Sequence, residues 1–256
     1  MSLAKYGPWA LIIGGNEGVG AAFAKKLAAQ GFKLVLTARK LEPMQILADE
    51  LSAGGAEVRI VSADLAQGDV LERVRSVTDD IEVGLLIYVA GANKIRGNFV
   101  ELEPSVTRDL IAITVTGQAE FARHYGGLMR ERGRGGIILS GSLAGYMGSP
   151  SLAPYCGVKA FSRVFTEALW AECKPLGIDV LHLNIGFTAT PAMERLNFDL
   201  SAAQSPEDVA QEGLDNIANG PVWIAGGKVN RDTAAARSVI DDRGAAIVRF
   251  ATPGRG

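Results

Sequence analysis

Short apolar segments alternate with longer helical segments along most of the chain, and this alternation limits the fold more than any other feature. The apolar segments have the length of β-strands, whereas the segments between the first four are amphipathic and long enough to cross over a sheet. Strands are predicted at 9–13, 33–37, 57–61, 83–89, 135–140, 179–185 and 221–225. Near-continuous apolar strands joined by helices predict an α/β fold: a doubly wound parallel sheet of about seven strands with helices on both faces.

The regular pattern changes after the sixth predicted strand and again at the C-terminal end. No Pro/Ser-rich linker, repeat or low-complexity tract divides residues 1–256, which favours a single domain. Residues 187–220 form an insertion, and a long insertion at such a place is more often functional than idle. Residues 226–256 form a charged tail, and the sequence leaves open whether it closes a substrate site or contacts another subunit.

Charge and composition argue against several classes of protein. A formal net charge of −2 gives no electrostatic support for binding to nucleic acid or to an acidic membrane. No apolar run reaches the ~20 residues of a membrane helix, and the N-terminus lacks the apolar core of a signal peptide. The two cysteines cannot form a disulfide framework, and His124 and His182 lie far apart in the sequence. We therefore expect a cytoplasmic protein without a metal site.

A glycine-rich turn follows the first predicted strand. Gly14, Gly18 and Gly20 fall before and at the start of the helix predicted at 18–30, where the backbone must turn sharply and approach a ligand closely. The N-terminus of that helix adds N–H groups and partial positive charge, as in the pyrophosphate-binding turn of a Rossmann-type fold. An ordinary turn is the alternative, and Glu17 within the turn would repel a phosphate.

The end of the second predicted strand indicates which dinucleotide would bind. An acidic residue there would bind the ribose 2′-hydroxyl of NAD, whereas a nearby arginine would accept the 2′-phosphate of NADP. The sequence has Ala38 followed by Arg39 and Lys40, which favours NADP(H) over NAD(H). The alternative is that the basic pair only begins a solvated loop.

A serine, a tyrosine and a lysine follow one another with a spacing that suits hydride-transfer chemistry. Ser142 lies at the end of the fifth strand, and Tyr155 and Lys159 are four residues apart on one face of a predicted helix. A carbonyl oxygen that gains negative charge needs a proton donor and a second hydrogen bond. A nearby ammonium is expected to lower the pKa of the tyrosine. The structural alternative is an accidental pair at the start of an amphipathic helix.

Three further segments complete a pattern that resembles the short-chain dehydrogenase/reductase superfamily. They are SADL with Asp64, the last two residues of YVAG at 88–91, and NIGFTATPAM around Gly186. Together with the glycine turn, Ser142 and the YxxxK pair, these segments extend the resemblance over residues 8–225.

The resemblance implies hydride transfer between a nicotinamide cofactor and a carbonyl or an alcohol. Ser142 would orient the substrate oxygen, Tyr155 would pass the proton, and Lys159 would hold the cofactor ribose. The implied cofactor site consists of Gly14, Asn16, Gly18, Val19, Gly20, Arg39, Asp64, Leu65, Ala90, Gly91, Tyr155, Lys159, Gly186, Thr188 and Thr190. A homodimer or homotetramer, formed through helices around 104–131 and 154–175, is implied as well.

Four positions depart from the family pattern. Ile13 and Val89 stand where a Thr and an Asn are usual, and Ile185 replaces a Pro. Because Ile13 and Val89 close adjoining strands, we expect their side chains to pack together. Thr114 stands where the family places a catalytic Asn that helps to hold a water beside the lysine. Its shorter side chain predicts slower catalysis.

The predicted substrate loop and the segment before Tyr155 are rich in apolar side chains: Phe187, Met193, Leu196, Phe198, Met147 and Leu152. They suggest a hydrophobic ketone or secondary alcohol as substrate, and the alternative is that they pack the loop onto the domain. Arg195 in the same loop is expected to be solvated, and the alternative is that it binds an anionic group of the substrate. Two other functions stay open: a catalytically weak or silent nucleotide-binding regulator, and a methyltransferase that binds S-adenosylmethionine, which would need an acid after the second strand.

Overall fold

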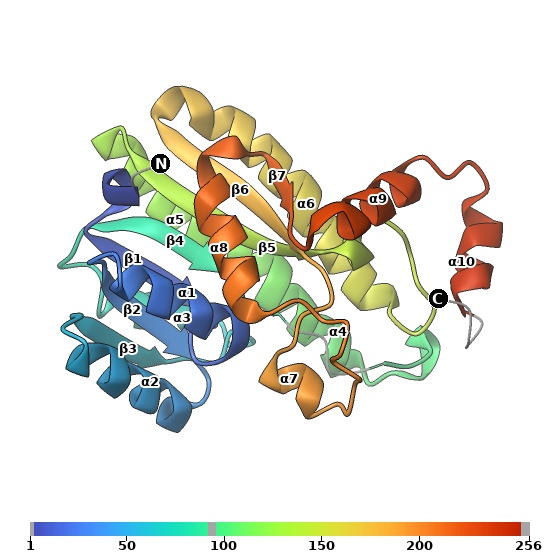
Figure 1. Cartoon of the computed structure of the whole chain (residues 1–256), viewed down its shortest axis with the longest axis horizontal. Helices are drawn as coiled ribbons and strands as arrows, with labels where there is room; N and C mark the ends of the chain where they lie inside the picture. Colours follow the sequence, from blue (N-terminus) through green and yellow to red (C-terminus); the bar gives the residue numbers. More distant parts are fainter. Residues whose placement is uncertain (1–2, 92–95, 252–256) are drawn as a thin grey trace.

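The computed structural model describes residues 3–91 and 96–251. Its centre is a seven-stranded sheet in the order β3–β2–β1–β4–β5–β6–β7, in which every neighbouring pair is parallel (Figure 1). The strands are β1 (Trp9–Ile13), β2 (Lys33–Ala38), β3 (Val58–Ser62), β4 (Val83–Tyr88), β5 (Gly135–Ser142), β6 (Ile178–Ile185) and β7 (Val222–Ile224). The predicted seven-stranded parallel sheet is confirmed, and each strand ends within two residues of its predicted bounds.

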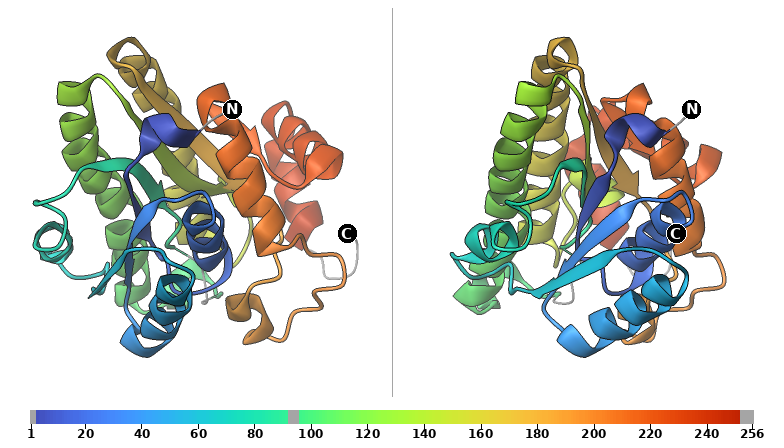
Figure 2. Two further views of the ribbon diagram at one scale, coloured as in Figure 1. Left: turned by 60° about the vertical axis from the view of Figure 1, so that its left-hand side comes forward. Right: turned by 90° about the vertical axis from the view of Figure 1, so that its left-hand side faces the viewer.

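Helices cover both faces of this sheet (Figure 2). One face carries α1 (Gly18–Ala28), α2 (Leu41–Ala53) and α8 (Pro206–Asn216), and the other carries α3 (Val70–Arg75), α5 (Gly117–Arg132) and α6 (Ala153–Cys173). The other helices are α4 (Pro104–Leu110), α7 (Pro191–Glu194), α9 (Gly227–Ser238) and α10 (Arg243–Ala251). Short 3₁₀ turns are η1 (Leu3–Tyr6), η2 (Phe99–Glu101), η4 (Leu143–Gly145), η5 (Lys174–Leu176) and η6 (Ile217–Asn219). The doubly wound arrangement predicted from the sequence is therefore present.

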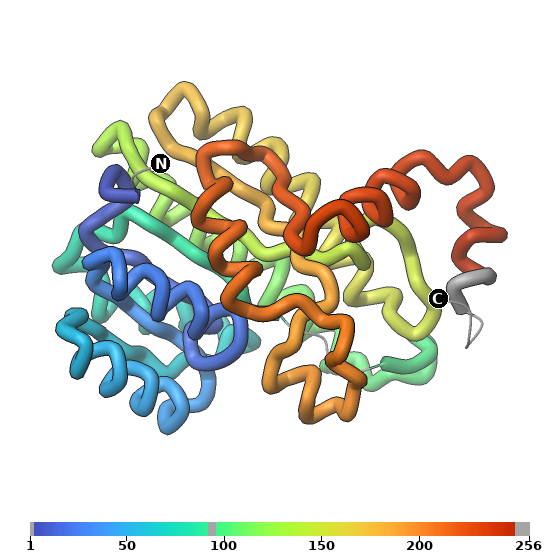
Figure 3. Tube along the Cα trace, viewed as in Figure 1, coloured from blue at the N-terminus to red at the C-terminus, as the bar shows by residue number. Residues whose placement is uncertain are grey.

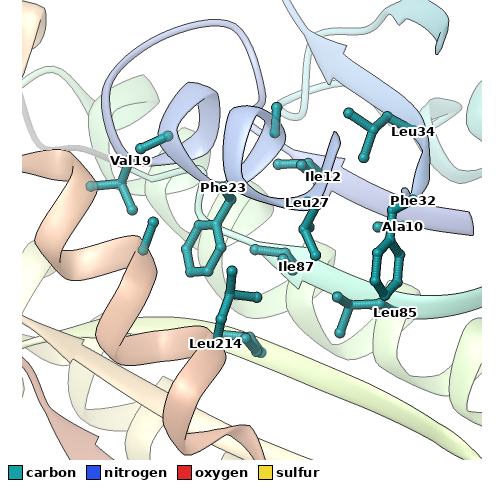
Figure 4. Close-up of a cluster of buried hydrophobic side chains, with 14 of the residues drawn as sticks. Ala10, Ile12, Val19, Phe23, Leu27, Phe32, Leu34, Leu85, Ile87 and Leu214 are labelled. Carbon is teal, nitrogen blue, oxygen red and sulfur yellow. The ribbon is translucent and has the colours of Figure 1, made fainter. Parts of the chain in front are cut away.

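Each central strand contributes side chains to two separate cores. Successive residues of a strand point to opposite faces, so Ile12 and Ile87 pack against Phe23 of α1 (Figure 4), whereas Leu11 and Leu86 belong to the cluster on the α5 side. Because helices bury both faces, both sets of positions must be apolar. This explains why the strands are continuous apolar runs instead of alternating ones.

The predicted packing of Ile13 against Val89 is wrong. Ile13 is in register with Tyr88 and belongs to the cluster on the α5 side, whereas Val89 packs against the cluster on the α1 side. The two residues are joined by their backbones instead, since the Val89 N–H donates to the Ile13 carbonyl oxygen at 2.9 Å. An offset of one residue reverses the face to which a strand side chain points, so the sheet itself separates the two side chains.

The helical segment predicted at 104–131 contains a π-helix, η3 (Ile111–Thr116), between α4 and α5. The Tyr88 hydroxyl donates to the Ile113 carbonyl oxygen at 2.5 Å. Gly117 follows directly, and a Cβ at Gly117 would lie 2.2 Å from the Tyr88 hydroxyl oxygen. A bulky side chain at the end of β4 is thus accommodated by a glycine at the start of α5. Single π-turns of this kind are frequent at functional sites.

The C-terminal tail folds against the loop that precedes α6. Figure 3 shows it leaving the body of the sheet after β7 and passing beside this loop. Arg237 Nη1 donates to the Leu143 carbonyl oxygen at 2.8 Å, and Arg243 Nη2 donates to the Tyr146 carbonyl oxygen at 3.0 Å. These contacts place α9 at the edge of the site described below. None of the helices in the described part of the chain combines the length and the hydropathy that crossing a membrane requires.

Candidate active site

A cavity of about 620 Å³ opens at the carboxyl ends of the central strands. It lies at the point where the strand order reverses, because β1 is followed by β2 on one side and has β4 on the other. Ligands of open α/β sheets bind in the crevice at such a switch point. Every residue of the predicted cofactor site lines this cavity, and so do Ser142, Tyr155 and Lys159. Thr114 is the one predicted site residue that does not.

The glycine turn has no room for side chains. Gly14 has a φ of +91°, and a Cβ there would lie 2.9 Å from the Ala90 nitrogen. A Cβ at Gly20 would lie 2.0 Å from the Gly14 carbonyl oxygen, so the first turn of α1 sits directly on the end of β1. Because Gly18, Val19 and Gly20 line the cavity, the positive end of the α1 dipole lies next to it. These residues fit the pyrophosphate of a nicotinamide dinucleotide.

Glu17 does not leave an unbalanced negative charge in this turn. Its carboxylate accepts two hydrogen bonds from the Arg195 guanidinium, at 2.5 Å and 3.0 Å. Arg195 was expected to be solvated, and its side chain is indeed 44% exposed, but it also forms a bidentate ion pair that the sequence did not predict. The pair also connects the phosphate turn to the loop that follows α7, 178 residues further along the chain. The expected repulsion between the Glu17 carboxylate and a phosphate is therefore reduced, because Arg195 balances the negative charge.

The nucleotide end of the cavity is formed where β2 and β3 finish. Arg39 lines the cavity, and the Ser62 hydroxyl donates to its carbonyl oxygen at 3.0 Å, which joins the two strand ends. Asp64 accepts a hydrogen bond from the Ala66 N–H at 3.2 Å, so its carboxylate is held in a turn. β2 ends at the small, buried Ala38, so the charged side chain next to this strand end is that of Arg39.

Ser142, Tyr155 and Lys159 come together from β5 and α6. Ser142 and Tyr155 both line the cavity, and the Ser142 hydroxyl is near enough to the Tyr155 phenol to influence its pKa. Lys159 Nζ lies 5.8 Å from the centroid of the Tyr155 ring and donates to the Ser140 carbonyl oxygen at 3.3 Å. The loop between Ser142 and Tyr155 packs closely on α6, since a Cβ at Gly145 would lie 2.7 Å from the Lys159 carbonyl oxygen. One turn of helix and one strand end thus present two hydroxyls and an ammonium to the same space.

Burial sets the protonation of the tyrosine and the lysine. Burial raises the pKa of Tyr155 above its ordinary value, against the opposing effects of the Ser142 hydrogen bond and the Arg96 charge. Lys159 is 3% exposed, and burial lowers the pKa of its ammonium to about 8. The expectation of a lowered Tyr155 pKa is wrong for this structure, because desolvation of the phenolate outweighs the charges around it. Tyr155 is consequently protonated at neutral pH.

A buried polar network continues behind Lys159. The Ser140 carbonyl oxygen also accepts hydrogen bonds from Gln118 Nε2 at 3.2 Å and from Ser162 Oγ at 3.4 Å. Ser162 in turn donates to Gln118 Oε1 at 2.7 Å. The sequence analysis missed both residues. The available signal was the spacing of Ser162, which follows Lys159 by three residues and therefore shares its helix face.

Thr114 lies behind the cavity wall, in the π-helix. It is fully buried, and its hydroxyl makes no hydrogen bond to any residue that the structure describes. A Cβ at Gly91 would lie 3.0 Å from Thr114 Oγ1 and 3.7 Å from Lys159 Nζ, so glycine separates the two groups. Thr114 is therefore close to Lys159 without contacting the cavity itself.

His182 and Asn184 on β6 are two further buried polar residues near the lysine. Neither side chain hydrogen-bonds to the described part of the chain, and burial lowers the pKa of His182 to about 3, which keeps it neutral. The charge of Lys159 lowers this pKa further. Within the described ranges, no group of three or more His, Cys, Asp or Glu side chains could hold a metal ion.

The substrate end of the cavity contains only part of the predicted apolar set. Phe187, Met193 and Leu152 line it, whereas Leu196, Phe198 and Met147 do not. The alternative, that these side chains pack the loop, applies to Phe198, whose ring packs edge-on against Phe187 with centroids 6.0 Å apart. Residues that the sequence analysis did not assign to this end are Val89, Arg96, Ile113, Leu143 and Arg237.

Comparison with known proteins identifies the family. A family model described as short chain dehydrogenase matches residues 8–200. The chain belongs to this family. It is 31% identical over 242 residues to a 7beta-hydroxysteroid dehydrogenase of Clostridium sardiniense, covering 93% of this chain and 92% of the relative. It is 30% identical over 218 residues to a very-long-chain 3-oxoacyl-CoA reductase of Neurospora crassa, covering 83% of this chain and 65% of the relative.

Solved structures agree with this assignment. A structure described in terms of 7beta-hydroxysteroid dehydrogenase stereoselectivity matches 98% of this chain and 99% of its own, with a TM-score of 0.90 and 30% identity. A short-chain dehydrogenase from Sphingobium yanoikuyae in complex with NADPH matches 97% of this chain and 98% of its own, with a TM-score of 0.80 and 25% identity. The predicted superfamily is confirmed. The chain is an oxidoreductase that acts on CH–OH or C=O groups, and the methyltransferase alternative is excluded.

Proposed function

We propose that the protein is an NADP(H)-dependent oxidoreductase that interconverts a hydrophobic ketone and a secondary alcohol, with Tyr155 as the acid/base. The observation that carries this proposal is the meeting of Ser142, Tyr155 and Lys159 with the glycine turn in one cavity. The similarity to a structure in complex with NADPH supports the cofactor. Relatives named for hydroxysteroids and for long-chain oxoacyl groups support a bulky, apolar substrate.

A bound nicotinamide supplies or accepts the hydride. In the reductive direction, Tyr155 gives its proton to the substrate oxygen as that oxygen gains negative charge. The raised pKa of Tyr155 keeps this proton available at neutral pH. The Ser142 hydroxyl, which lines the cavity beside Tyr155, orients the same oxygen and supplies the second hydrogen bond. Lys159, held by the Ser140 carbonyl oxygen, presents its ammonium to the ribose hydroxyls.

The remaining site residues divide the cofactor between them. The glycine turn binds the pyrophosphate, Arg39 the ribose 2′-phosphate and Asp64 the adenine. Gly186, Thr188 and Thr190 bind the nicotinamide end, where the Thr190 hydroxyl accepts a hydrogen bond from the Met193 N–H and caps α7. We propose these contacts with the cofactor. We also propose that the chain forms a single catalytic domain, assembles as a homodimer or homotetramer and is cytoplasmic.

The test begins with parallel titrations of the purified protein with NADPH and NADH, followed by cofactor fluorescence. We expect NADPH to bind about 10- to 100-fold more tightly, because a charge-assisted contact with a phosphate contributes ~1.5–3 kcal/mol. Arg39→Met should remove most of this preference. Lys40→Met, at the next and exposed position, is the matched control and should retain it. Equal affinities for the two cofactors would contradict the NADP(H) assignment.

A panel of bulky ketones then tests the chemistry. We expect turnover that falls by a factor of about 10²–10⁴ in Tyr155→Phe, because a positioned proton donor contributes this much to the rate. Cofactor affinity should remain close to that of the wild type. Cofactor binding without turnover on any ketone of the panel would favour the alternative of a silent nucleotide-binding regulator.

A further inference from the structure

Charge is distributed unevenly along the cavity. Two arginines, Arg96 and Arg237, line the substrate end. The carboxylates among the described lining residues are Glu17 and Asp64, and both belong to the nucleotide end. Glu17 is moreover paired with Arg195. Among the residues that the structure describes, the charged side chains at the substrate end are therefore arginines.

Arg237 makes two hydrogen bonds, and its partner Arg243 makes a third to the same loop. Its Nη1 donates to the carbonyl oxygen of Leu143, the residue that follows the catalytic Ser142. Its own carbonyl oxygen accepts a hydrogen bond from Arg243 Nη1 at 3.1 Å, and Arg243 Nη2 donates to Tyr146 at 3.0 Å. The end of α9 is thereby attached to the loop between Ser142 and Tyr155. A guanidinium that is already positioned loses little conformational freedom when a ligand binds.

Arg237 keeps its positive charge at the wall of the cavity. The residue is half-buried, and burial lowers its pKa, but a guanidinium keeps its charge throughout the physiological pH range. Charges interact more strongly where the effective dielectric is low, so this half-buried guanidinium would attract an anionic group of a substrate more strongly than a solvated guanidinium would.

We propose that Arg237 is a specificity-determining residue that binds an oxyanion, a carboxylate or a phosphate, carried by an otherwise apolar ketone substrate. A guanidinium has five N–H donors, so it can donate to an oxyanion while it keeps its bond to Leu143. Arg96, whose guanidinium lies 5.5 Å from the centroid of the Phe198 ring, adds positive charge at the same end. The inference rests on the proposed function, because it names the substrate class of the same site.

The experiment compares each anionic ketone with a neutral counterpart. One pair is a steroidal keto acid and its methyl ester, and the other is a 3-oxoacyl-CoA and the corresponding N-acetylcysteamine thioester. The two pairs distinguish a carboxylate from a phosphate as the source of the oxyanion. We expect the wild type to prefer the anionic member of one pair by about 30-fold in kcat/KM, mostly through KM, because the contact is equally present before and during the reaction.

Variants then assign this preference to one side chain. Arg237→Met should abolish the preference, and Arg237→Lys should restore part of it, since an ammonium keeps the charge but not the fork of donors. Arg231→Met is the matched control on the same helix. Arg231 is exposed and does not line the cavity, so this variant should keep the full preference. Thermal unfolding of each variant checks that the fold is intact.

The contrary outcomes separate the inference from the proposed function. Equal kcat/KM values within both pairs, or a preference that survives in folded Arg237→Met, would overturn the inference while the proposed function stands. Turnover of no ketone would overturn the proposed function. The inference would then be judged by equilibrium binding of the steroidal keto acid to the NADPH-bound protein. It stands if Arg237→Met weakens that binding about 30-fold and falls if the affinity is unchanged.

Discussion

The nucleotide end and the substrate end of the cavity are built in different ways. At the nucleotide end, strand ends and the first turn of α1 lie so close together that Gly14 and Gly20 leave no space for a Cβ. At the substrate end, α9 and the loop after β6 are held by side-chain contacts such as those of Arg237 and Phe198. The backbone of the fold thus forms the part of the site that suits a cofactor of constant shape. Side chains on segments outside the sheet form the part where substrates differ.

Gly20→Ala should disrupt the packing of the nucleotide end and produce the largest loss of NADPH affinity among these variants. The new Cβ would lie 2.0 Å from the Gly14 carbonyl oxygen, so α1 must move away from the turn. We expect NADPH affinity to fall by at least about 100-fold and the free energy of unfolding to fall by ~2–3 kcal/mol. Cofactor fluorescence and urea unfolding measure the two effects.

Gly127→Ala is the control for Gly20→Ala. Gly127 lies within α5, and nothing lies within 4 Å of a Cβ built there. This variant should be slightly more stable than the wild type, by up to about 1 kcal/mol, since alanine favours a helix over glycine. Wild-type NADPH affinity in Gly20→Ala would contradict a nucleotide end made by close backbone contacts.

Lys159→Met tests the boundary between the two ends, where a buried ammonium that the reaction needs also destabilises the folded state. Lowering the pKa of the buried ammonium from 10.5 to about 8 costs the folded state about 3 kcal/mol. The variant should therefore be inactive and yet more stable at pH 7, by ~2–3 kcal/mol, as measured by urea unfolding. Lys228→Met, whose side chain is 82% exposed, should change stability by less than about 0.5 kcal/mol.

The pH dependence of this difference has a defined sign. Between pH 8 and 10.5 the unfolded chain keeps the Lys159 proton that the folded chain has lost, so wild-type stability rises with pH. The advantage of Lys159→Met should accordingly shrink across this range. An advantage that stays constant up to pH 10.5 would show that the cost does not come from the buried charge.

Thr114→Asn tests whether the residue buried behind Lys159 limits catalysis. The Thr114 hydroxyl lies near Lys159 without a described hydrogen-bond partner, and an amide reaches further. We expect kcat to rise by about one to two orders of magnitude, within the range of acid–base assistance, with NADPH affinity unchanged. Steady-state kinetics measure this. Thr116→Asn, exposed on the same π-helix, should leave kcat at the wild-type value, and an unchanged or lower kcat in Thr114→Asn would refute the prediction.

The Glu17–Arg195 pair links the two ends, and its effect should be the smallest. Both side chains are partly exposed, so a double-mutant cycle on the free energy of unfolding with Glu17→Gln and Arg195→Met should give a coupling of ~0.5–1 kcal/mol. Arg195→Met alone should weaken NADPH binding about threefold, because it leaves Glu17 to repel the phosphates. Glu17→Gln in the same chain should restore the affinity. A coupling of zero would show that the two ends are energetically independent.

The sequence alone was enough to predict the sheet and the set of residues that line one cavity as the candidate cofactor site. The strands, the glycine turn and the set of Ser142, Tyr155 and Lys159 are local signals. Periodicity and spacing reveal them without knowledge of any distant contact. The sequence also identified Thr114 as a departure from the family, although not its position behind Gly91.

The features that depend on contacts between distant segments could not be predicted from the sequence. These are the opposite faces taken by Ile13 and Val89, the pairing of Glu17 with Arg195, and the entry of Arg237 into the substrate end. The raised pKa of Tyr155 belongs with them. Strand register, ion pairs between remote residues and desolvation all arise when the chain packs. A local sequence pattern cannot predict them, because each depends on which residues become neighbours in the folded protein.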